Sequence, residues 1–369
     1  KNLRVLSFCI ITIATLLTNH ASAETTVAGN YAGGDGTSGN PYQIKTLAEL
    51  RLLSETSTDW GADTYFILTA DIDATDTNTW NIGDHDSSAA TVDEAMGFSP
   101  IGIGTWEFRF LGSLDGQDYV ISNLYINRPG QHQVGLISRS GSGGIIANLG
   151  IENVNISGYR HTGGLIGENT GATITSCHIT GSVTGNDEDT GGLIGLNTDG
   201  SITSCYTSGS VSGMGDTGGL IGENRNGSIT SCNSSSNVDS LRSRVGGLIG
   251  FNYNGVIDSC YATGTVSSSA YHIGGFIGRH LTGNISNCYA TGSIIGTGDS
   301  YVGGFAGIID GGNIDTCYST GVLLGTGSSG IHIGGFAGKI SNSTVTSCYS
   351  TASAAIVSRS FCKSILVIF

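Results

Sequence analysis

Apolar and β-branched residues form short runs that alternate with Gly, Asn, Asp and Ser along most of the chain. Residues 218–222 read Gly-Gly-Leu-Ile-Gly, and residues 228–232 read Ser-Ile-Thr-Ser-Cys after a polar turn. Such units contain no stretch with apolar residues at i, i+3, i+4 and i+7, and their glycines and β-branched residues disfavour helix. The pattern therefore predicts short strands separated by turns.

The same unit recurs at a regular interval. The motif Gly-Gly-(Leu/Phe)-(Ile/Ala)-Gly begins at Gly163, Gly191, Gly218, Gly246, Gly274, Gly303 and Gly334. A cysteine recurs in phase with it, at Cys177, Cys205, Cys232, Cys260, Cys288, Cys317 and Cys348. Both markers advance by the same steps of 27 to 31 residues, which indicates an internal repeat. A strand-and-turn unit of this length is typical of one solenoid coil, so we expect an all-β parallel β-helix over residues 131–353, with coils of about 28 residues.

The region before the repeats, residues 24–130, carries the main helix signal. Residues 46–49 (Thr-Leu-Ala-Glu) form a capping box, and Leu47, Leu50 and Leu53 fall on one face of the short helix that it opens. A solenoid needs an end that shields its first coil from water and from other strand edges. We therefore expect a small α/β N-terminal cap and the first strands of the solenoid in this region.

The two ends of the sequence differ from the repeats. Residues 1–23 combine basic Lys1 and Arg4, a short apolar stretch and the small-residue site 21–23 (Ala-Ser-Ala). This predicts a cleaved secretory signal peptide rather than a membrane anchor, because the apolar stretch is too short to span a bilayer comfortably. Residues 354–369 share nothing with the repeats, and we interpret them as an atypical tail left by truncation or a shifted reading frame.

Two runs carry a resemblance to a known family. Residues 163–169 read Gly-Gly-Leu-Ile-Gly-Glu-Asn, residues 218–224 repeat them, and the sequence from Ile285 fits the same unit. These runs resemble the GLUG motif of bacterial secreted and surface proteins, and with the leader the resemblance covers residues 34–353. It implies a right-handed β-helix of the kind found in filamentous-haemagglutinin-like adhesins and in the non-catalytic region of IgA-peptidase-type proteins. The motif is specific for architecture and transfers no catalytic residue to this sequence.

The balance of acidic and basic residues in the chain argues against one class of binding partner. The chain has 29 acidic and 15 basic residues and a formal net charge of -14. Surfaces that bind nucleic acid need clustered Lys and Arg, so we expect no nucleic-acid partner. A mean hydropathy of +0.08 indicates that the chain is apolar enough to fold.

The in-phase cysteines have two interpretations. Neighbouring coils would place equivalent cysteines about 4.8 Å apart, which is within the Cα range of a disulfide. Their Cβ vectors would run parallel, however, and the spacing is unlike that of zinc clusters. We therefore interpret Cys177, Cys205, Cys232, Cys260, Cys288, Cys317 and Cys348 as a structural packing column, with one or two adjacent disulfides as the alternative.

The residue after each cysteine belongs to a second column, which on an alternating strand faces the opposite way. It contains His178, Tyr206, Asn233, Tyr261, Tyr289, Tyr318 and Tyr349. If the cysteines point inward, the tyrosines form an outward aromatic ladder that can stack on sugar rings or anchor a protein. The alternative is that exposed strand tyrosines stack only on one another. The candidate binding residues are Tyr206, Tyr261, Tyr289, Tyr318 and Tyr349.

Metal and catalytic signals are sparse. Asp71, Asp73 and Asp76 offer spaced oxygen ligands, but the segment lacks the glycine and the glutamate of a calcium loop. We expect no cofactor, with calcium at these three residues as the alternative to a solvated loop. A second acidic turn lies at residues 186–189.

A polysaccharide-active β-helix enzyme would need convergent acids on one face. Between Gly163 and residue 353 the basic residues are Arg225, Arg242, Arg244, Arg279 and Lys339. Arg242 and Arg244 share one turn, far from any carboxylate set that the sequence reveals. No zinc-peptidase motif or phosphate-binding loop is present, so we assign no catalytic residue.

These observations lead to one reading and two alternatives. We expect an exported, cell-surface or secreted β-helical repeat protein that binds an extracellular glycan or protein without catalysis and has no membrane span in the mature chain. The first alternative is a rigid spacer or accessory module of a larger secreted hydrolase or peptidase. The second is a polysaccharide-active enzyme.

Overall fold

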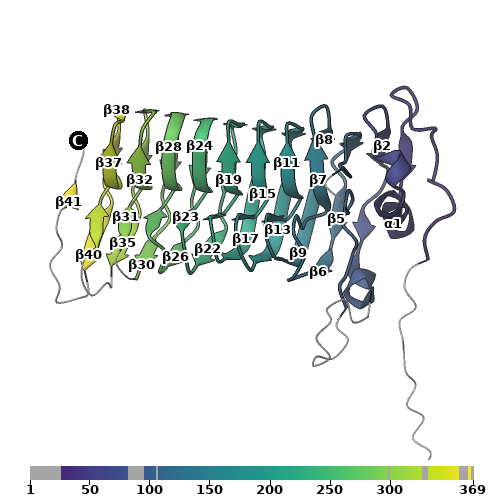
Figure 1. The fold of residues 1–369 in the computed structure, drawn as a ribbon, viewed down its shortest axis with the longest axis horizontal. Helices are drawn as coiled ribbons and strands as arrows, with labels where there is room; N and C mark the ends of the chain where they lie inside the picture. The colour runs from purple at the N-terminus through teal and green to yellow at the C-terminus, as the bar shows by residue number, and fades with distance from the viewer. Residues whose placement is uncertain are drawn as a thin grey trace, which may run out of the picture.

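The computed structural model describes residues 26–81, 95–104, 107–297, 300–325, 331–356 and 365–366. The expected signal peptide, residues 1–23, lies outside these residues, as does most of the expected tail. The described residues form an elongated parallel β-solenoid whose coils stack along one axis (Figure 1). Strands pair one repeat apart, so that Thr190 pairs with Thr162 below it and with Thr217 above it. The predicted all-β parallel solenoid with coils of about 28 residues is confirmed.

Three sheets run along the solenoid. The first contains β1 (Tyr42–Ile44), β2 (Tyr65–Leu68), β4 (Ser113–Asp115), β7 (Ile137–Gly141), β8 (Ile145–Ala147), β11 (Ile166–Thr170), β12 (Thr173–Thr175), β15 (Ile194–Thr198), β16 (Ser201–Thr203), β19 (Ile221–Arg225), β20 (Ser228–Thr230), β24 (Ile249–Asp258), β28 (Ile277–Ser286), β32 (Ala306–Asp310), β33 (Asn313–Asp315), β37 (Ala337–Ser341) and β38 (Thr344–Thr346). The second contains β10 (Thr162–Gly163), β14 (Thr190–Gly191), β18 (Thr217–Gly218), β23 (Arg244–Gly246), β27 (His272–Gly274), β31 (Tyr301–Gly303), β36 (His332–Gly334) and β41 (Ile365–Leu366). The third contains β3 (Ile72–Asp73), β5 (Val120–Ser122), β6 (Tyr125–Asn127), β9 (Gly150–Gly158), β13 (His178–Gly185), β17 (Tyr206–Gly213), β21 (Asn233–Ser234), β22 (Asn237–Ser240), β25 (Tyr261–Ala262), β26 (Val266–Ser268), β29 (Tyr289–Ala290), β30 (Ile294–Gly296), β34 (Tyr318–Ser319), β35 (Val322–Gly325), β39 (Tyr349–Ser350) and β40 (Ser353–Ile356).

The Gly-Gly motif forms the corner between the second sheet and the first. A Cβ on Gly218 would lie 2.0 Å from the carbonyl oxygen of Ile221, and a Cβ on Gly219 would lie 2.2 Å from the carbonyl oxygen of Gly247. Neither contact can be relieved by moving a side chain, because both partners are backbone atoms. The paired glycines therefore let the backbone of one coil turn sharply against itself and against the next coil.

A second corner precedes each in-phase cysteine. The residues there have φ between 52° and 56°, the left-handed region, and they are Ser176, Ser204, Ser231, Ser259, Asn287, Thr316 and Ser347. This conformation turns the chain from the first sheet into the third and directs the following cysteine inward. Short polar side chains tolerate the left-handed backbone conformation better than bulky ones do, which explains in part why this position is occupied by Ser, Asn or Thr.

The core is built from columns that repeat in every coil. The third motif position is fully buried throughout, at Leu165, Leu193, Leu220, Leu248, Phe276, Phe305 and Phe336. The three phenylalanines stack with ring centroids 4.7 and 4.9 Å apart. Identical apolar residues in successive coils thus pack directly on one another along the solenoid axis.

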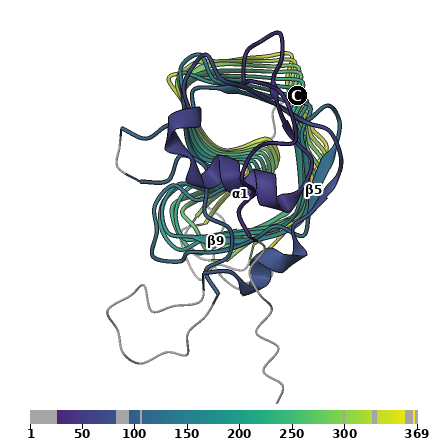
Figure 2. The same ribbon diagram turned by 90° about the vertical axis from the view of Figure 1, so that its right-hand side faces the viewer.

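Helix α1 (Leu47–Glu55) lies across the N-terminal end of the stack (Figure 2). Its capping box is present, with Glu49 Oε2 accepting from the Thr46 backbone N–H at 2.8 Å. Leu47, Leu50 and Leu53 are buried on the face toward the first coils. Two short 3₁₀ helices follow, Ser57–Asp59 and Thr75–Thr79.

The solenoid sheets continue beyond both ends of the predicted repeats. Strands β2 and β4 pair within the leader, and β4 pairs in turn with β8 of the repeats. At the other end, β40 and β41 fall in the region that we took as an atypical tail, yet they pair in parallel with β35 and β36. The backbone of these described tail residues therefore stacks on the last coil.

Candidate functional site

The cysteine column lies inside the solenoid. All seven cysteines are buried and are free thiols in this structure. The Sγ of one coil accepts the backbone N–H of the cysteine in the preceding coil, as from Cys205 to Cys232 at 3.4 Å, and it contacts a carbonyl oxygen, Thr230 O, at 3.2 Å. Burial raises the pKa of the Cys288 thiol well above its usual value. Because all seven are buried, these thiols are placed for packing and weak hydrogen bonding at the corner rather than for reaction with solutes.

A buried asparagine ladder accompanies the cysteines, and sequence reasoning missed it. Asn169, Asn197, Asn224 and Asn252 are fully buried, and the Nδ2 of each of the first three donates to the Oδ1 of the next asparagine at 2.7 Å. The same Nδ2 atoms donate to a carbonyl three residues onward, as from Asn224 to Gly227 at 3.2 Å. The ladder ends where Asn252 Nδ2 meets His280 Nδ1 at 3.0 Å. The available signal was the asparagine six residues after each of the first four Gly-Gly motifs.

The tyrosine column faces solvent, opposite the buried cysteines. Tyr261, Tyr289, Tyr318 and Tyr349 stack with centroids 4.9, 4.9 and 5.2 Å apart and ring planes within 7° of parallel. Both faces of Tyr289 and of Tyr318 are therefore covered by neighbouring tyrosines. This limits the expected stacking on sugar rings, because the inner members can offer a ligand only their edges and hydroxyl groups.

The ladder is interrupted at one coil. Tyr206 stacks on His178 at 4.8 Å and pairs in register with Asn233, which pairs with Tyr261. Asn233 thus stands where the stack would have a ring, and the strand spacing places Tyr206 and Tyr261 about 9.6 Å apart, or two rungs. One face of Tyr206 and one face of Tyr261 are not covered by another ring of the column.

Two further columns meet across the Gly-Gly corner, and together we call them the corner face. The first, two residues before each Gly-Gly, contains His161, Asp189, Asp216, Arg244, His272, Tyr301 and His332. The second, five residues after the first glycine, contains Glu168, Leu196, Glu223, Phe251, Arg279, Ile308 and Lys339. Side chains of the two columns touch, as shown by the Arg244 guanidinium 3.7 Å from the Phe251 ring centroid. A constant offset from the Gly-Gly motif was the signal that could have found this face.

The acidic part of the corner face is a buried cluster. Asp189, Asp216 and Glu223 place one carboxylate oxygen each within 4.8 Å of the others, the arrangement that a metal ion requires. Burial raises the pKa of Asp216 to about 6 and also raises the pKa of Glu223, because each charge is removed from water.

Each carboxylate of this cluster has a basic partner. Arg244 Nε donates to Asp216 Oδ1 at 2.7 Å, which corrects our expectation that Arg244 lies far from any carboxylate set. Arg225 Nε donates to Glu223 Oε1 at 2.6 Å, and His161 Nδ1 lies 2.8 Å from Asp189 Oδ2. The cluster therefore contains two arginine–carboxylate ion pairs and one histidine–carboxylate contact, and a metal would compete with these three partners.

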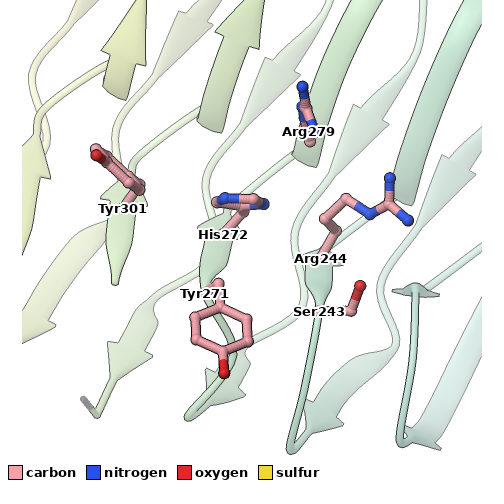
Figure 3. Close-up of a pocket in the computed structure, with 6 residues that line it drawn as sticks. All are labelled: Ser243, Arg244, Tyr271, His272, Arg279 and Tyr301. Atoms are coloured by element: carbon pink, nitrogen blue, oxygen red, sulfur yellow. The ribbon is translucent and has the colours of Figure 1, made fainter. Parts of the chain in front are cut away.

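The basic part of the corner face forms a pocket of about 440 Å³ (Figure 3). Its lining residues come from successive coils and are Ser243, Arg244, Tyr271, His272, Arg279 and Tyr301. In Figure 3 Arg244, His272 and Tyr301 follow one another along the second sheet, with Arg279 beside them on the first. The residues that line this pocket are mainly cationic and aromatic, in contrast to the acidic balance of the whole chain.

Two of the three aspartates considered as alternative calcium ligands accept hydrogen bonds from other residues of the protein. Asp71 Oδ1 accepts the Val120 backbone N–H at 2.9 Å, and Asp73 Oδ1 accepts from the Thr75 hydroxyl at 2.6 Å. Among the described residues, the group with ligand atoms mutually within range of one ion is the cluster of the corner face, which does not include Asp71, Asp73 or Asp76. The sequence alternative of calcium at these three residues therefore receives no geometric support.

Comparison with family models finds the GLUG motif four times in this chain. The matched segments are residues 158–184, 186–212, 242–267 and 269–295. The resemblance that the repeat carried is thereby confirmed, and these segments coincide with coils of the solenoid.

Two curated proteins are similar to part of the chain. Halomucin of Haloquadratum walsbyi is 35% identical over 154 residues, which are 42% of this chain and 2% of that protein. A "Putative Gly-rich membrane protein" of Evansella cellulosilytica is 33% identical over 122 residues, which are 33% of this chain and 12% of that protein. The chain thus corresponds to a small part of each relative.

A solved structure shares the fold. The crystal structure of a "putative immunoglobulin A1 protease" from Bacteroides ovatus superposes with a TM-score of 0.54 over 87% of this chain and 89% of that one, at 21% identity. At this identity the likeness concerns the fold alone. Within the described part of the chain, no helix is long and apolar enough to cross a membrane.

Proposed function

We propose that this chain is an exported, surface-associated repeat protein that binds extracellular glycan or protein ligands without catalysis. Its GLUG repeats and its likeness to a protein named as a membrane protein support a role at the cell surface. The elongated parallel solenoid supports a binding role, because it presents each side-chain column as a straight, rigid row.

The observation that carries the proposal is the interrupted tyrosine ladder. Tyr206 is 43% exposed, and its outer face and that of Tyr261 point toward the coil of Asn233, where the ladder has no ring. The Asn233 side chain occupies the rung between these two faces, but it is smaller than an aromatic ring. A sugar ring can therefore contact the parts of the two tyrosine faces that lie beyond the amide, and the amide can hydrogen-bond to it.

The first test is binding of the purified chain to a panel of polysaccharides and extracellular-matrix proteins, with ligand chain length measured before and after incubation. We expect retention without shortening, and a loss of affinity of about 2- to 10-fold on Tyr206→Ala or Tyr261→Ala, as removal of one stacking partner predicts. Tyr253→Ala is the matched control, since Tyr253 is 44% exposed but belongs to no stack. Shortened polysaccharide would overturn the non-catalytic assignment, and an equal loss in Tyr253→Ala would remove the ladder as the binding surface.

A spacer role is the second candidate function. Both relatives are far longer than the segments that match this chain, so in each of them the matched segment is one part of a longer protein. If the chain bound no member of the panel, we would assign it as a rigid element that holds other domains at a distance.

A further inference from the structure

The pocket of the corner face concentrates positive charge on an acidic protein. Five basic residues occur between Gly163 and residue 353, and two of them, Arg244 and Arg279, line this one pocket. Both guanidinium groups lie over the ring of Phe251, at 3.7 and 6.0 Å from its centroid. The lining residues include no carboxylate. An anion entering the pocket would therefore meet no acidic side chain of the lining and two guanidinium groups, each paired with one acid outside the lining.

The two arginines are held in place by acids outside the lining and retain free donors. Arg244 Nε donates to Asp216, and Arg279 Nη2 donates to Asp310 Oδ2 at 3.0 Å. A guanidinium carries five N–H groups, so each arginine has N–H groups beyond those that these contacts use. Because the side chains are already anchored, little conformational entropy is lost when they bind a ligand.

Aromatic rings occupy the other side of the pocket. Tyr301 stacks on His332 at 4.7 Å with planes 8° apart, and its centroid lies 6.0 Å from that of His272. Tyr271, at the mouth, is 66% exposed, the largest exposed fraction among the apolar and aromatic side chains that are exposed. Rings beside cations match a ligand that combines a ring with an anionic group.

The pKa of His272 reflects its burial in the pocket and the basic side chains near it. Burial, and then the charges of Arg279, Arg244 and Lys339, lower the pKa of His272 to about 4. The imidazole is therefore neutral at pH 7 and can donate or accept a hydrogen bond. Burial accounts for the largest part of this pKa shift and favours no ion, whereas the smaller part, which comes from the three basic side chains, has the sign that favours an anion.

From this geometry we infer that the pocket binds the carboxylate-bearing ring of an acidic polysaccharide, that is, a uronic acid residue. The planar carboxylate would lie against the guanidinium groups of Arg244 and Arg279, which already pair with carboxylates of the protein. The pyranose ring would lie against Tyr271 and Tyr301. This site is on a different face from the tyrosine ladder and does not depend on ligand binding there.

The test compares three tetrasaccharides that differ only at C6: cellotetraose, its uronate form and its C6-sulfate form, titrated into the full chain by calorimetry at pH 7 and about 0.15 M salt. We expect measurable binding of the uronate, weaker binding of the sulfate, and at least about tenfold weaker binding of cellotetraose, as the loss of a charge-assisted hydrogen bond predicts. Equal affinity for the uronate and the neutral sugar, tighter binding of the sulfate, or no binding of the uronate would each overturn the assignment.

Matched variants locate the site. Arg279→Gln should weaken uronate binding about tenfold or more, while Arg279→Lys should lose less, because it keeps the charge without the planar fork. Arg242→Gln is the control, since Arg242 lies in the same turn as Arg244 but is exposed and does not line the pocket. An equal effect of Arg242→Gln and Arg279→Gln would show diffuse attraction to positive charge and would overturn the pocket assignment.

Two further variants distinguish a loss of uronate binding from a loss of folding. Tyr271→Ala changes an exposed ring, so it should leave the thermal midpoint unchanged and weaken uronate binding several-fold. Asp310→Asn removes the negative charge beside Arg279 but keeps an amide oxygen that can accept from Nη2, so Arg279 stays anchored and uronate binding should tighten. If uronate affinity were unchanged in both variants, the ligand would lie elsewhere on the chain. Tyr206→Ala should leave uronate binding intact, which separates this inference from the proposed function.

Discussion

The buried asparagine ladder predicts a pH-dependent defect for Asn224→Asp. Asn224 Nδ2 donates to Asn252 Oδ1 at 2.7 Å and to Gly227 O at 3.2 Å, while Asn224 Oδ1 accepts from Asn197 at 2.7 Å. Aspartate has the same shape but replaces the donor with an oxygen. When ionised, it places a charge in a fully buried site and faces two acceptors with no proton between them.

The size of the effect follows from the protonation of the new side chain. A protonated aspartic acid can donate to Asn252 Oδ1 and so loses about one hydrogen bond, or about 1 kcal/mol. Burial without a cationic partner raises the folded-state pKa of the new carboxyl above its unfolded value of about 3.9. A raised pKa gives stability that is present below pH 4 and is lost as the pH rises through the folded value. If the group stayed protonated to pH 7, the additional loss between pH 4 and pH 7 would be about 4 kcal/mol.

The assay is urea unfolding followed by far-UV circular dichroism at pH 4, 5, 6 and 7, with the variant compared with the wild type at each pH. We expect the difference in midpoint to widen steadily from pH 4 to pH 7. Asn226→Asp is the control, because Asn226 is exposed and accepts from Asn254 Nδ2 at 3.1 Å, a role that aspartate can fill. A constant difference for Asn224→Asp across this range would refute the idea that the amide donors of the ladder stabilise the solenoid.

Three further expectations follow from other buried groups. The pKa of Asp216 is raised to about 6, so its contribution to the free energy of unfolding is present below about pH 4 and is lost as the pH rises through 6. In Asp216→Asn, the fall in the free energy of unfolding between pH 4 and pH 7 should therefore be smaller by up to about 3 kcal/mol. Urea unfolding at these two pH values would measure the difference. The Cys288 thiol should resist iodoacetamide in the native chain and react in urea, as mass spectrometry would show, and rapid labelling of the native chain would contradict its burial. Gly219→Ala should lower the thermal midpoint strongly, because its Cβ would lie 2.2 Å from a backbone oxygen, whereas Gly130→Ala, which meets nothing within 4 Å, should not.

The sequence was sufficient to predict the coil but not the surface of the coil. The Gly-Gly motif and the cysteine, which recur with the same spacing, identified the repeat, and the capping box at Thr46 and Glu49 identified α1. Each of these signals depends on residues that are close together in the chain. The pairing of Arg244 with Asp216 was missed, although both residues lie two positions before a Gly-Gly motif. Their common offset places them on adjacent strands, but the contact of their side chains also depends on how sharply the glycine corner closes.

The tyrosine ladder illustrates a different limit. Alternation along the strand placed the tyrosines opposite the cysteines, but it could not say how the rings would orient. Once they stack, neighbouring rings cover both faces of Tyr289 and of Tyr318, and the coil of Asn233 becomes the position where two tyrosine faces have no ring against them. Asn233, which interrupts the tyrosine pattern in the sequence, therefore says more about where a ligand can bind than the tyrosines that follow the pattern.

The same reasoning extends to the whole solenoid. Positions that face inward or form corners, such as Gly218 and Cys232, are held nearly constant because each coil must fit on the next. Positions on the corner face have no such requirement, and they change from acidic at Asp216 to basic at Arg279 along one continuous surface. Ligand chemistry in a repeat protein of this kind should accordingly be sought where successive coils differ. The uronate pocket satisfies that criterion, because its cationic and aromatic residues replace the acidic residues that earlier coils carry at the same two positions.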